Sequence, residues 1–189
     1  RIEVGELPLD IELLEIGAVV ERAVRSVTLL AERAHIELRV ETSPVRRVRG
    51  DAVRLHQVLV NLLSNAIKFQ GAPGVIQVQV SEAPRQRPCA ESFFGIEADD
   101  AVRITVSDEG PGLTQEQCIR VFDAFYQVDA SSTRSHGGAG LGLSIVSKLV
   151  HAHGGDVWAE SELGRGASFS FTVPLADAAK GSSSADLDF

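Results

Sequence analysis

Apolar side chains recur at helical spacing in several parts of the chain. Steps of three and four residues from about 15 to 35 predict a first amphipathic helix, and a second is expected from a capping residue, Asp51, to about Phe69. The apolar face of the second helix consists of Leu55, Leu59, Leu62, Leu63 and Ala66. Shorter helices are expected over 114–125 and 140–152, and a pair of glycines follows the latter.

Alternation of apolar and polar residues predicts strands elsewhere in the chain. The expected strands are 36–40, 75–80, 101–107, 156–161 and 168–173. Residues 1–14 are interpreted as a linker, 81–100 as a long loop and 176–189 as a polar tail, which leaves one domain over 15–175. Elements in this order favour an α/β fold, with helices on one face of a mixed sheet whose other face is partly wet.

The composition limits the classes of function. A length of 189 residues suits one domain with a complete core. The net charge of −8 argues against general nucleic-acid binding, although backbone amides and a few basic residues can still bind an anion locally. Two isolated cysteines, Cys89 and Cys118, suit a reducing compartment. No apolar run reaches the roughly 18 residues of a membrane span, so we expect a cytoplasmic domain, whose parent protein can still be membrane-anchored.

Three polar residues form a stripe on the second predicted helix. Because a helix turns about 100° per residue, Asn61, Asn65 and Lys68 fall within an arc about 60° wide, away from the leucines. Amide oxygens are hard ligands that suit Mg²⁺, and a lysine is a point charge for phosphate. Taken alone, this stripe fits an ordinary solvated helix face better than a binding site.

Two glycine-rich segments lie downstream of that helix. Asp108 ends a predicted strand, where its carboxylate can accept a hydrogen bond from an exocyclic amine, and Gly110 and Gly112 let the backbone approach a flat ring. An ordinary acidic turn explains the same residues. The run Gly137-Gly-Ala-Gly-Leu-Gly-Leu143 opens a predicted helix, whose free amides can bind phosphate. It is neither a Walker motif nor a dinucleotide fingerprint.

Five segments, in this order, resemble the catalytic ATP-binding domain of sensor histidine kinases, within the superfamily that includes gyrase-type and mismatch-repair ATPases. Residues 51–69 resemble the N box, 108–112 the first glycine box, 122–127 the F box, 138–143 the second glycine box and 164–169 the closing glycine motif. The resemblance implies a Bergerat-type fold, a two-layer sandwich of about three helices on a mixed, mostly antiparallel sheet of about five strands.

The resemblance also implies roles for individual residues. Asp108 would bind the adenine amine and Gly112 would line the ring, together with Gly110. Asn65 would hold Mg²⁺, while Asn61 and Lys68 would lie at the phosphates of ATP. Residues 126–139 would form a lid over the nucleotide. The remaining nucleotide-binding positions implied by the motifs are Phe125, Arg134, Gly138, Gly140, Leu141 and Gly142.

One position separates this chain from the hydrolysing relatives, which typically carry a glutamate where Asn61 stands. An amide cannot act as a general base, so we expect a kinase that keeps the γ-phosphoryl group for a protein side chain. None of the histidines His35, His56, His136, His151 and His153 has the context of a phosphoacceptor, and a structural role is expected for each. Residues 1–7 resemble the end of the dimerisation hairpin that carries that histidine.

The partners implied are therefore the phosphoacceptor hairpin of the same or a sister chain and the receiver domain of a response regulator, with no nucleic acid. The parent protein is expected to be a homodimer and this chain a monomer. Gln70, Gln127 and Ala139 depart from the usual motifs. They keep open a catalytically impaired nucleotide-binding or scaffolding module, and a serine kinase of the anti-sigma type is a further alternative.

Overall fold

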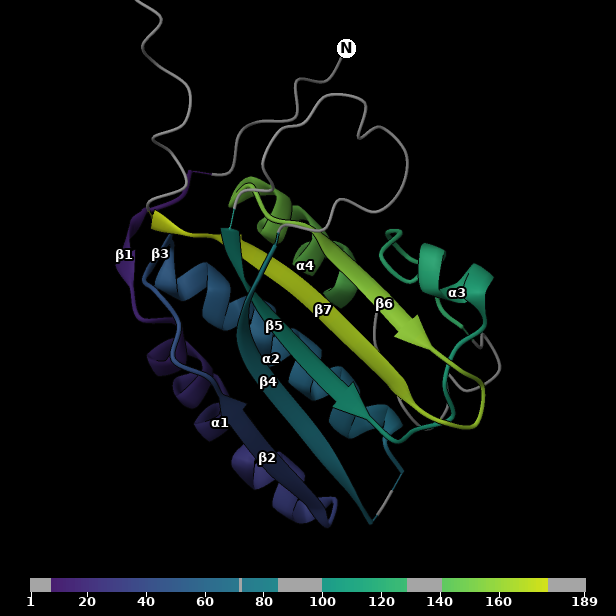
Figure 1. Ribbon diagram of the computed structural model, residues 1–189. Coiled ribbons are helices and arrows are strands. Elements are labelled where there is room, and N and C mark those ends of the chain that lie inside the picture. Colours follow the sequence, from purple (N-terminus) through teal and green to yellow (C-terminus); the bar gives the residue numbers. More distant parts are fainter. Residues whose placement is uncertain (1–7, 72, 85–99, 129–140, 177–189) are drawn as a thin grey trace, which may run out of the picture.

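The computed structural model of the chain describes residues 8–71, 73–84, 100–128 and 141–176 (Figure 1). Within these ranges the chain forms four helices and seven strands. The helices are α1 (Ile16–Arg33), α2 (Ala52–Phe69), α3 (Gln115–Arg120) and α4 (Gly142–Ala152). The strands are β1 (Glu12–Leu14), β2 (Ile36–Thr42), β3 (Val48–Gly50), β4 (Gly74–Pro84), β5 (Asp100–Asp108), β6 (Val157–Ser161) and β7 (Ala167–Pro174). None of these described helices is both long enough and apolar enough to span a bilayer.

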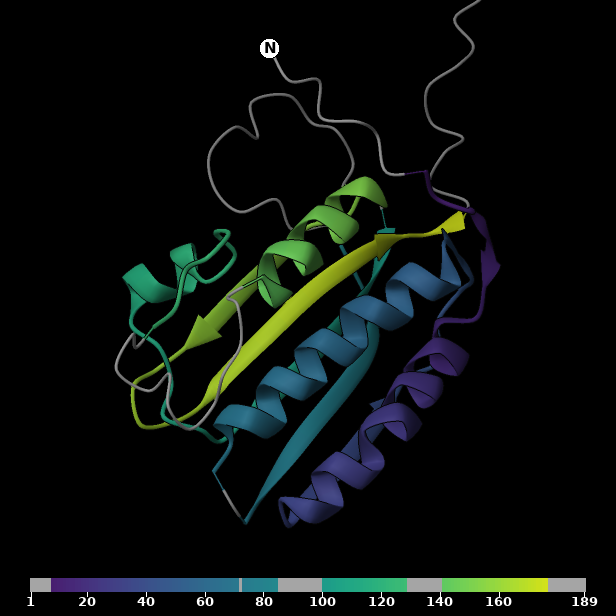
Figure 2. The same ribbon diagram turned by 180° about the vertical axis from the view of Figure 1, so that it is seen from behind.

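Five of the strands form the main sheet, in the order β2-β4-β5-β7-β6. β2 and β4 run parallel, and the other neighbouring pairs are antiparallel. Figure 2 shows α1, α2 and α4 side by side on one face of this sheet, with α2 in the middle, while the short α3 lies apart beside β6. The predicted sandwich of three helices on a mixed, mostly antiparallel sheet is therefore confirmed.

The core lies between the helices and the inner face of the sheet. The leucine face of α2 is buried as predicted, and Leu55, Leu59 and Leu63 are completely shielded from solvent. The alternating apolar residues of the sheet that meet this face are Ile76, Val78, Val80, Val102, Ile104, Val106, Phe169, Phe171 and Val173. The outer face carries polar residues such as Gln79, which is exposed as the alternation predicted.

Two short strands were not expected from the sequence. β1 pairs antiparallel with β3, so Glu12 lies opposite Gly50, and Val48 also forms a bridge with Leu175 just after β7. The linker predicted over 1–14 is therefore replaced by a strand at 12–14, while 1–7 lie outside the described residues. Each of these strands has three residues, which is too short for alternation to reveal.

Two element boundaries also differ from the prediction. The helix expected over 114–125 ends at Arg120, and the chain then turns, with Phe125 in the left-handed region at φ 65°. β4 continues to Pro84, into the segment expected to be a loop, because its residues from Gln77 to Pro84 pair with β5. The rest of that segment, 85–99, lies outside the described residues.

A buried histidine ties α4 to the beginning of α2. His153 Nε2 accepts a hydrogen bond from the Asp51 backbone N–H at 3.0 Å, and Nδ1 lies 2.7 Å from the Leu149 carbonyl oxygen. Since a carbonyl can only accept, Nδ1 carries the proton and the ring is neutral. The structural role expected for His153 is confirmed, because its ring joins the end of α4 to the residue that precedes α2.

The carboxylate of Asp51 completes this junction. Its Oδ1 accepts hydrogen bonds from the N–H groups of Val53 and Arg54, so Asp51 is the predicted N-cap, and its Oδ2 accepts one from Asp10. Burial raises the pKa of Asp51, but these N–H donors outweigh burial and hold the pKa below its ordinary value.

Replacing His153 with alanine should lower the free energy of unfolding by about 1–3 kcal/mol, because the N–H of Asp51 would lose its partner in a buried place. His151→Ala is the matched control, since that ring is exposed and, among the described residues, hydrogen-bonds the carbonyl and hydroxyl of Ser147 in its own helix. Urea unfolding of both variants tests this tie. Equal losses of stability in the two variants would contradict it.

Candidate functional site

The middle helix α2 presents the predicted polar stripe on its surface. Asn61, Asn65 and Lys68 are all partly exposed, while the leucines of the same helix are buried. Asn61 Nδ2 donates a hydrogen bond of 3.5 Å to the carbonyl oxygen of Gly142, the first residue of α4. The structure thus brings together Asn61 of the N box and Gly142 near the end of the second glycine box, which are 81 residues apart.

The amide of Asn65 makes no hydrogen bond within the described part of the chain. Next along the stripe, Lys68 Nζ lies 4.8 Å from the centroid of the Phe69 ring, which is itself 49% exposed. An amide oxygen that no described residue hydrogen-bonds and an ammonium on a half-exposed aromatic ring are both suited to take a ligand from solvent.

Asp108 ends β5 beside the C-terminal end of α2. Its side chain is buried, and Oδ1 accepts hydrogen bonds from the N–H groups of Gly110 at 2.9 Å and Ala167 at 3.3 Å. Among the described residues, none donates a hydrogen bond to Oδ2. Burial raises the pKa of Asp108, and the two N–H groups offset only part of this rise. The site therefore offers an acceptor oxygen on a largely buried residue, held in place through its other oxygen.

The glycines around Asp108 are required by close packing. A Cβ on Gly110 would lie 2.5 Å from the Phe69 carbonyl oxygen, and one on Gly112, at φ +72°, would lie 2.2 Å from the Glu162 carbonyl oxygen. A Cβ on Gly166 would strike the backbone of Asp108 in the same way. The turn after Asp108 is therefore fixed between the end of α2 and the turn that joins β6 to β7.

The sequence did not reveal the structural role of one residue in this region. Gln70 was noted only as a departure from the usual motif, yet it is buried and its side chain hydrogen-bonds Glu109, the residue after Asp108. The two residues are 39 positions apart, so no local pattern could have revealed the contact.

In the F box, one phenylalanine packs against the core and another is exposed on the surface. Phe122 packs edge-to-face on Phe169, with the ring centroids 6.3 Å apart. Phe125, the predicted nucleotide contact, is 73% exposed, and no hydrogen bond or ring contact joins it to the other described site residues. Its assigned role stays a prediction.

The second glycine box is described only from Leu141 onward. The carbonyl oxygen of Leu141 accepts bonds from Ser144 and Ile145 at the start of α4. A Cβ on Gly142 would meet nothing within 4 Å, so packing does not require a glycine there and open space borders the helix start. Arg134, Gly138, Gly140 and most of the predicted lid lie outside the described residues.

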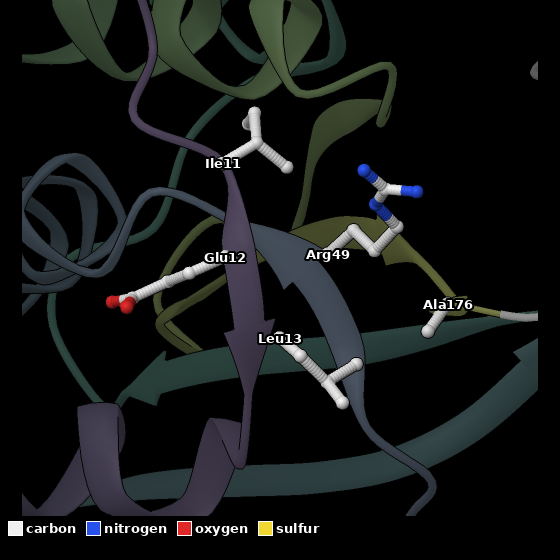
Figure 3. A pocket seen from close by; sticks show the side chains of 5 residues that line it. All are labelled: Ile11, Glu12, Leu13, Arg49 and Ala176. Atoms are coloured by element: carbon white, nitrogen blue, oxygen red, sulfur yellow. The ribbon is translucent and has the colours of Figure 1, made fainter.

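A surface cavity of about 290 Å³ lies elsewhere, at β1 and β3 (Figure 3). Ile11 and Leu13 point to the same side as Arg49 and Ala176, and Glu12 points to the other. This cavity adjoins the residues before α2, whereas Asn61, Asn65 and Lys68 lie on the C-terminal half of that helix, and none of the predicted site residues lines the cavity. The cavity is thus separate from the candidate site.

A family comparison agrees with the motifs. The model of the family described as histidine kinase-, DNA gyrase B- and HSP90-like ATPases matches residues 50–177. This range contains α2, Asp108 and the described part of the second glycine box.

Individual proteins are also similar. Hybrid signal transduction histidine kinase D of Dictyostelium discoideum is 35% identical over 86% of this chain, which spans 12% of that protein. Full-length ShkA in complex with AMPPNP has a TM-score of 0.73 and 33% identity, over 91% of this chain and 32% of ShkA. The nucleotide-free catalytic domain of histidine kinase ThkA has a TM-score of 0.68 and 26% identity, over 87% of this chain and 97% of that domain.

Proposed function

Because this chain belongs to the family of histidine kinase-, DNA gyrase B- and HSP90-like ATPases, and resembles the histidine kinase catalytic domains within it, we propose that it binds Mg-ATP and donates the γ-phosphoryl group to a histidine on a separate dimerisation and phosphoacceptor domain. The acceptor hairpin would belong to the same or a sister chain of a homodimeric parent protein. A response-regulator receiver domain would then take the phosphoryl group in two-component signalling.

Asp108 is the observation that carries this proposal. Asp108 is 9% exposed, one of its carboxylate oxygens is occupied by backbone N–H groups and the other receives no hydrogen bond from the described residues. An acceptor oxygen held in this way in a largely buried residue is suited to a donor that a ligand supplies. The exocyclic amine of adenine is such a donor, and the turn at Gly110 and Gly112 would present backbone, not side chains, to the ring.

The donor set on α2 fits a magnesium ion that arrives with the nucleotide. The described residues contain no cluster of three histidine, cysteine or acidic side chains that could hold a metal by themselves. Mg²⁺ is commonly bound by one or two protein oxygens together with substrate phosphates, and the Asn65 amide, which no described residue engages, provides one such oxygen. When bound, the ion would neutralise charge on the phosphates.

The remaining residues of the stripe would position the phosphates. Lys68 supplies a positive charge one turn beyond Asn65. Asn61 already holds the start of α4 through Gly142, so its amide can orient the free N–H groups of that helix toward a phosphate. Since Asn61 cannot deprotonate water, the proposed site retains ATP for transfer, and transfer depends on alignment with the acceptor histidine.

The proposal is tested by titrating the chain with ATP and ADP in the presence of Mg²⁺ by calorimetry, and then supplying a histidine-bearing hairpin as a separate polypeptide. Binding of both nucleotides followed by labelling of the hairpin from γ-labelled ATP is expected. The absence of binding would refute the proposal. Binding without transfer to any such hairpin would favour the alternative, a nucleotide-binding module.

A further inference from the structure

The side chain of Gln70 closes the gap between α2 and the turn that follows β5. Gln70 is the C-cap of α2 and is 6% exposed. Its Oε1 accepts a hydrogen bond of 2.8 Å from the N–H of Glu109, and its Nε2 donates one of 3.3 Å to Glu109 Oε2. One amide thus holds both the backbone and the side chain of the same residue.

The bonded N–H belongs to the peptide that joins Glu109 to Asp108. Fixing this peptide fixes the backbone from which the Asp108 side chain starts, while the N–H of Gly110 fixes its Oδ1. The position of Oδ2, which no described residue hydrogen-bonds, therefore depends on this peptide, on the Gly110 N–H and on the Ala167 N–H of β7. Gln70 supplies the contact that comes from the end of α2.

The surrounding chain leaves space for this side chain. A Cβ on Gly74 would lie 1.9 Å from Gln70 Nε2, so only a glycine at the start of β4 allows the amide to reach its partner. The Val75 N–H also donates to Glu109 Oε2, at 3.3 Å. The carboxylate of Glu109 is therefore held by an amide from α2 and by the beginning of β4.

We propose that Gln70 is a positioning residue for adenine recognition: it holds the Asp108–Glu109 peptide so that Oδ2 of Asp108 faces the exocyclic amine of the base. This inference rests on the proposed function, since it assigns Gln70 a part in the same nucleotide site. Gln70 touches no nucleotide atom in this scheme. It determines how strongly the site prefers a base that carries an amine.

The test compares the affinities for ADP and inosine diphosphate, which lacks the amine, in the presence of Mg²⁺. In Gln70→Glu a second carboxylate would stand next to Glu109, and the two would repel each other. We expect ADP affinity to fall about tenfold, while inosine diphosphate affinity stays nearly unchanged. The readout is the ratio of the affinities for ADP and inosine diphosphate, because a general loss of structure would lower both affinities alike.

Two further variants sharpen the test. Gln70→Glu combined with Glu109→Gln exchanges the two groups and restores a carboxylate–amide pair, so the preference for ADP should return to within about twofold of wild type. Gln79→Glu is the matched control, because Gln79 Nε2 also donates to a glutamate, Glu41, at 3.1 Å on the exposed face of the sheet. It should leave both affinities unchanged.

The outcomes separate this inference from the proposed function. A wild-type chain that binds neither nucleotide would overturn the proposed function. A wild-type chain that prefers ADP, with the same preference in Gln70→Glu, would overturn the role of Gln70 alone. The role of Gln70 would also be overturned if the double variant preferred ADP as weakly as Gln70→Glu does, or if Gln79→Glu lost the preference to a similar extent.

Discussion

Replacing Asp108 with asparagine should weaken ATP and ADP binding about 100-fold. The variant keeps the shape of the side chain, and its Oδ1 can still accept from Gly110 and Ala167. The amide NH₂ would then occupy the place of Oδ2 and would face the adenine amine, so two donors would meet in a buried place. Such an unpaired buried group costs about 1–3 kcal/mol, and the lost charge-assisted bond adds to it. Calorimetry with Mg-ADP measures the change.

The stability of the same variant provides its control. Burial raises the pKa of Asp108, so the folded protein binds this proton more tightly than the unfolded chain does. The stabilisation from that proton is complete below the unfolded pKa and is lost as the pH rises through the folded pKa. At neutral pH the charged carboxylate is therefore a cost, and Asp108→Asn should be as stable as the wild type or more so in urea. If Asp108→Asn were less stable than the wild type, its loss of nucleotide binding would be explained by damage to the fold.

The raised pKa also predicts how wild-type binding responds to acid. Protonation of Asp108 turns an acceptor into a group that can donate, so ADP affinity should decline at a pH above that at which an ordinary aspartate titrates. The Asp108→Asn variant should lack this decline. Equal declines in both would assign the acid sensitivity to another group.

Replacing Asn65 with alanine should lower phosphoryl transfer to a supplied histidine hairpin about 1,000-fold, which corresponds to about 4 kcal/mol of transition-state stabilisation. The physical reason is the loss of the amide oxygen proposed to hold Mg²⁺. No described residue hydrogen-bonds this amide, so its removal should change the free energy of unfolding little. Transfer rates at saturating ATP are the measurement.

A second readout identifies the metal role directly. The ratio of ATP affinities with Mg²⁺ and with a chelator should exceed one in the wild type and approach one in Asn65→Ala. Gln57→Ala is the matched control. Gln57 also carries an amide, and it lies on the same side of α2, about 12 Å from Asn65 along the helix axis toward the start of the helix. A Gln57 variant with the same loss, or an Asn65 variant that still responds to Mg²⁺, would refute the assignment.

The sequence predicted those features that depend on residues close together in the chain. The cap at Asp51, the leucine face of α2 and the stripe of Asn61, Asn65 and Lys68 all follow from one helical period, and the structure has this helix within a residue of its predicted bounds. The five strands of the main sheet followed from alternation in the same way, because their inner faces are buried.

The features that the sequence could not predict depend on distant pairs. The bond from Gln70 to Glu109 joins residues 39 apart, and that from His153 to Asp51 joins residues 102 apart. Each is a single polar contact that leaves no periodic signal. The pairing of β1 with β3 has the same character, since two strands of three residues each are specified by their partners and not by their own composition.

The position of β3 determines how this domain can be moved between proteins. On one side β3 pairs with β1, and on the other Val48 forms a backbone bridge with Leu175. β3 therefore joins the first strand of the domain to the residue that follows its last strand, β7. A graft begun at residue 15 would discard β1 and leave the edge of β3 without its partner, whereas a graft begun at residue 8 would keep the β1–β3 pair. In a chimaera built with that boundary, β3 would keep the backbone pairing that it has here.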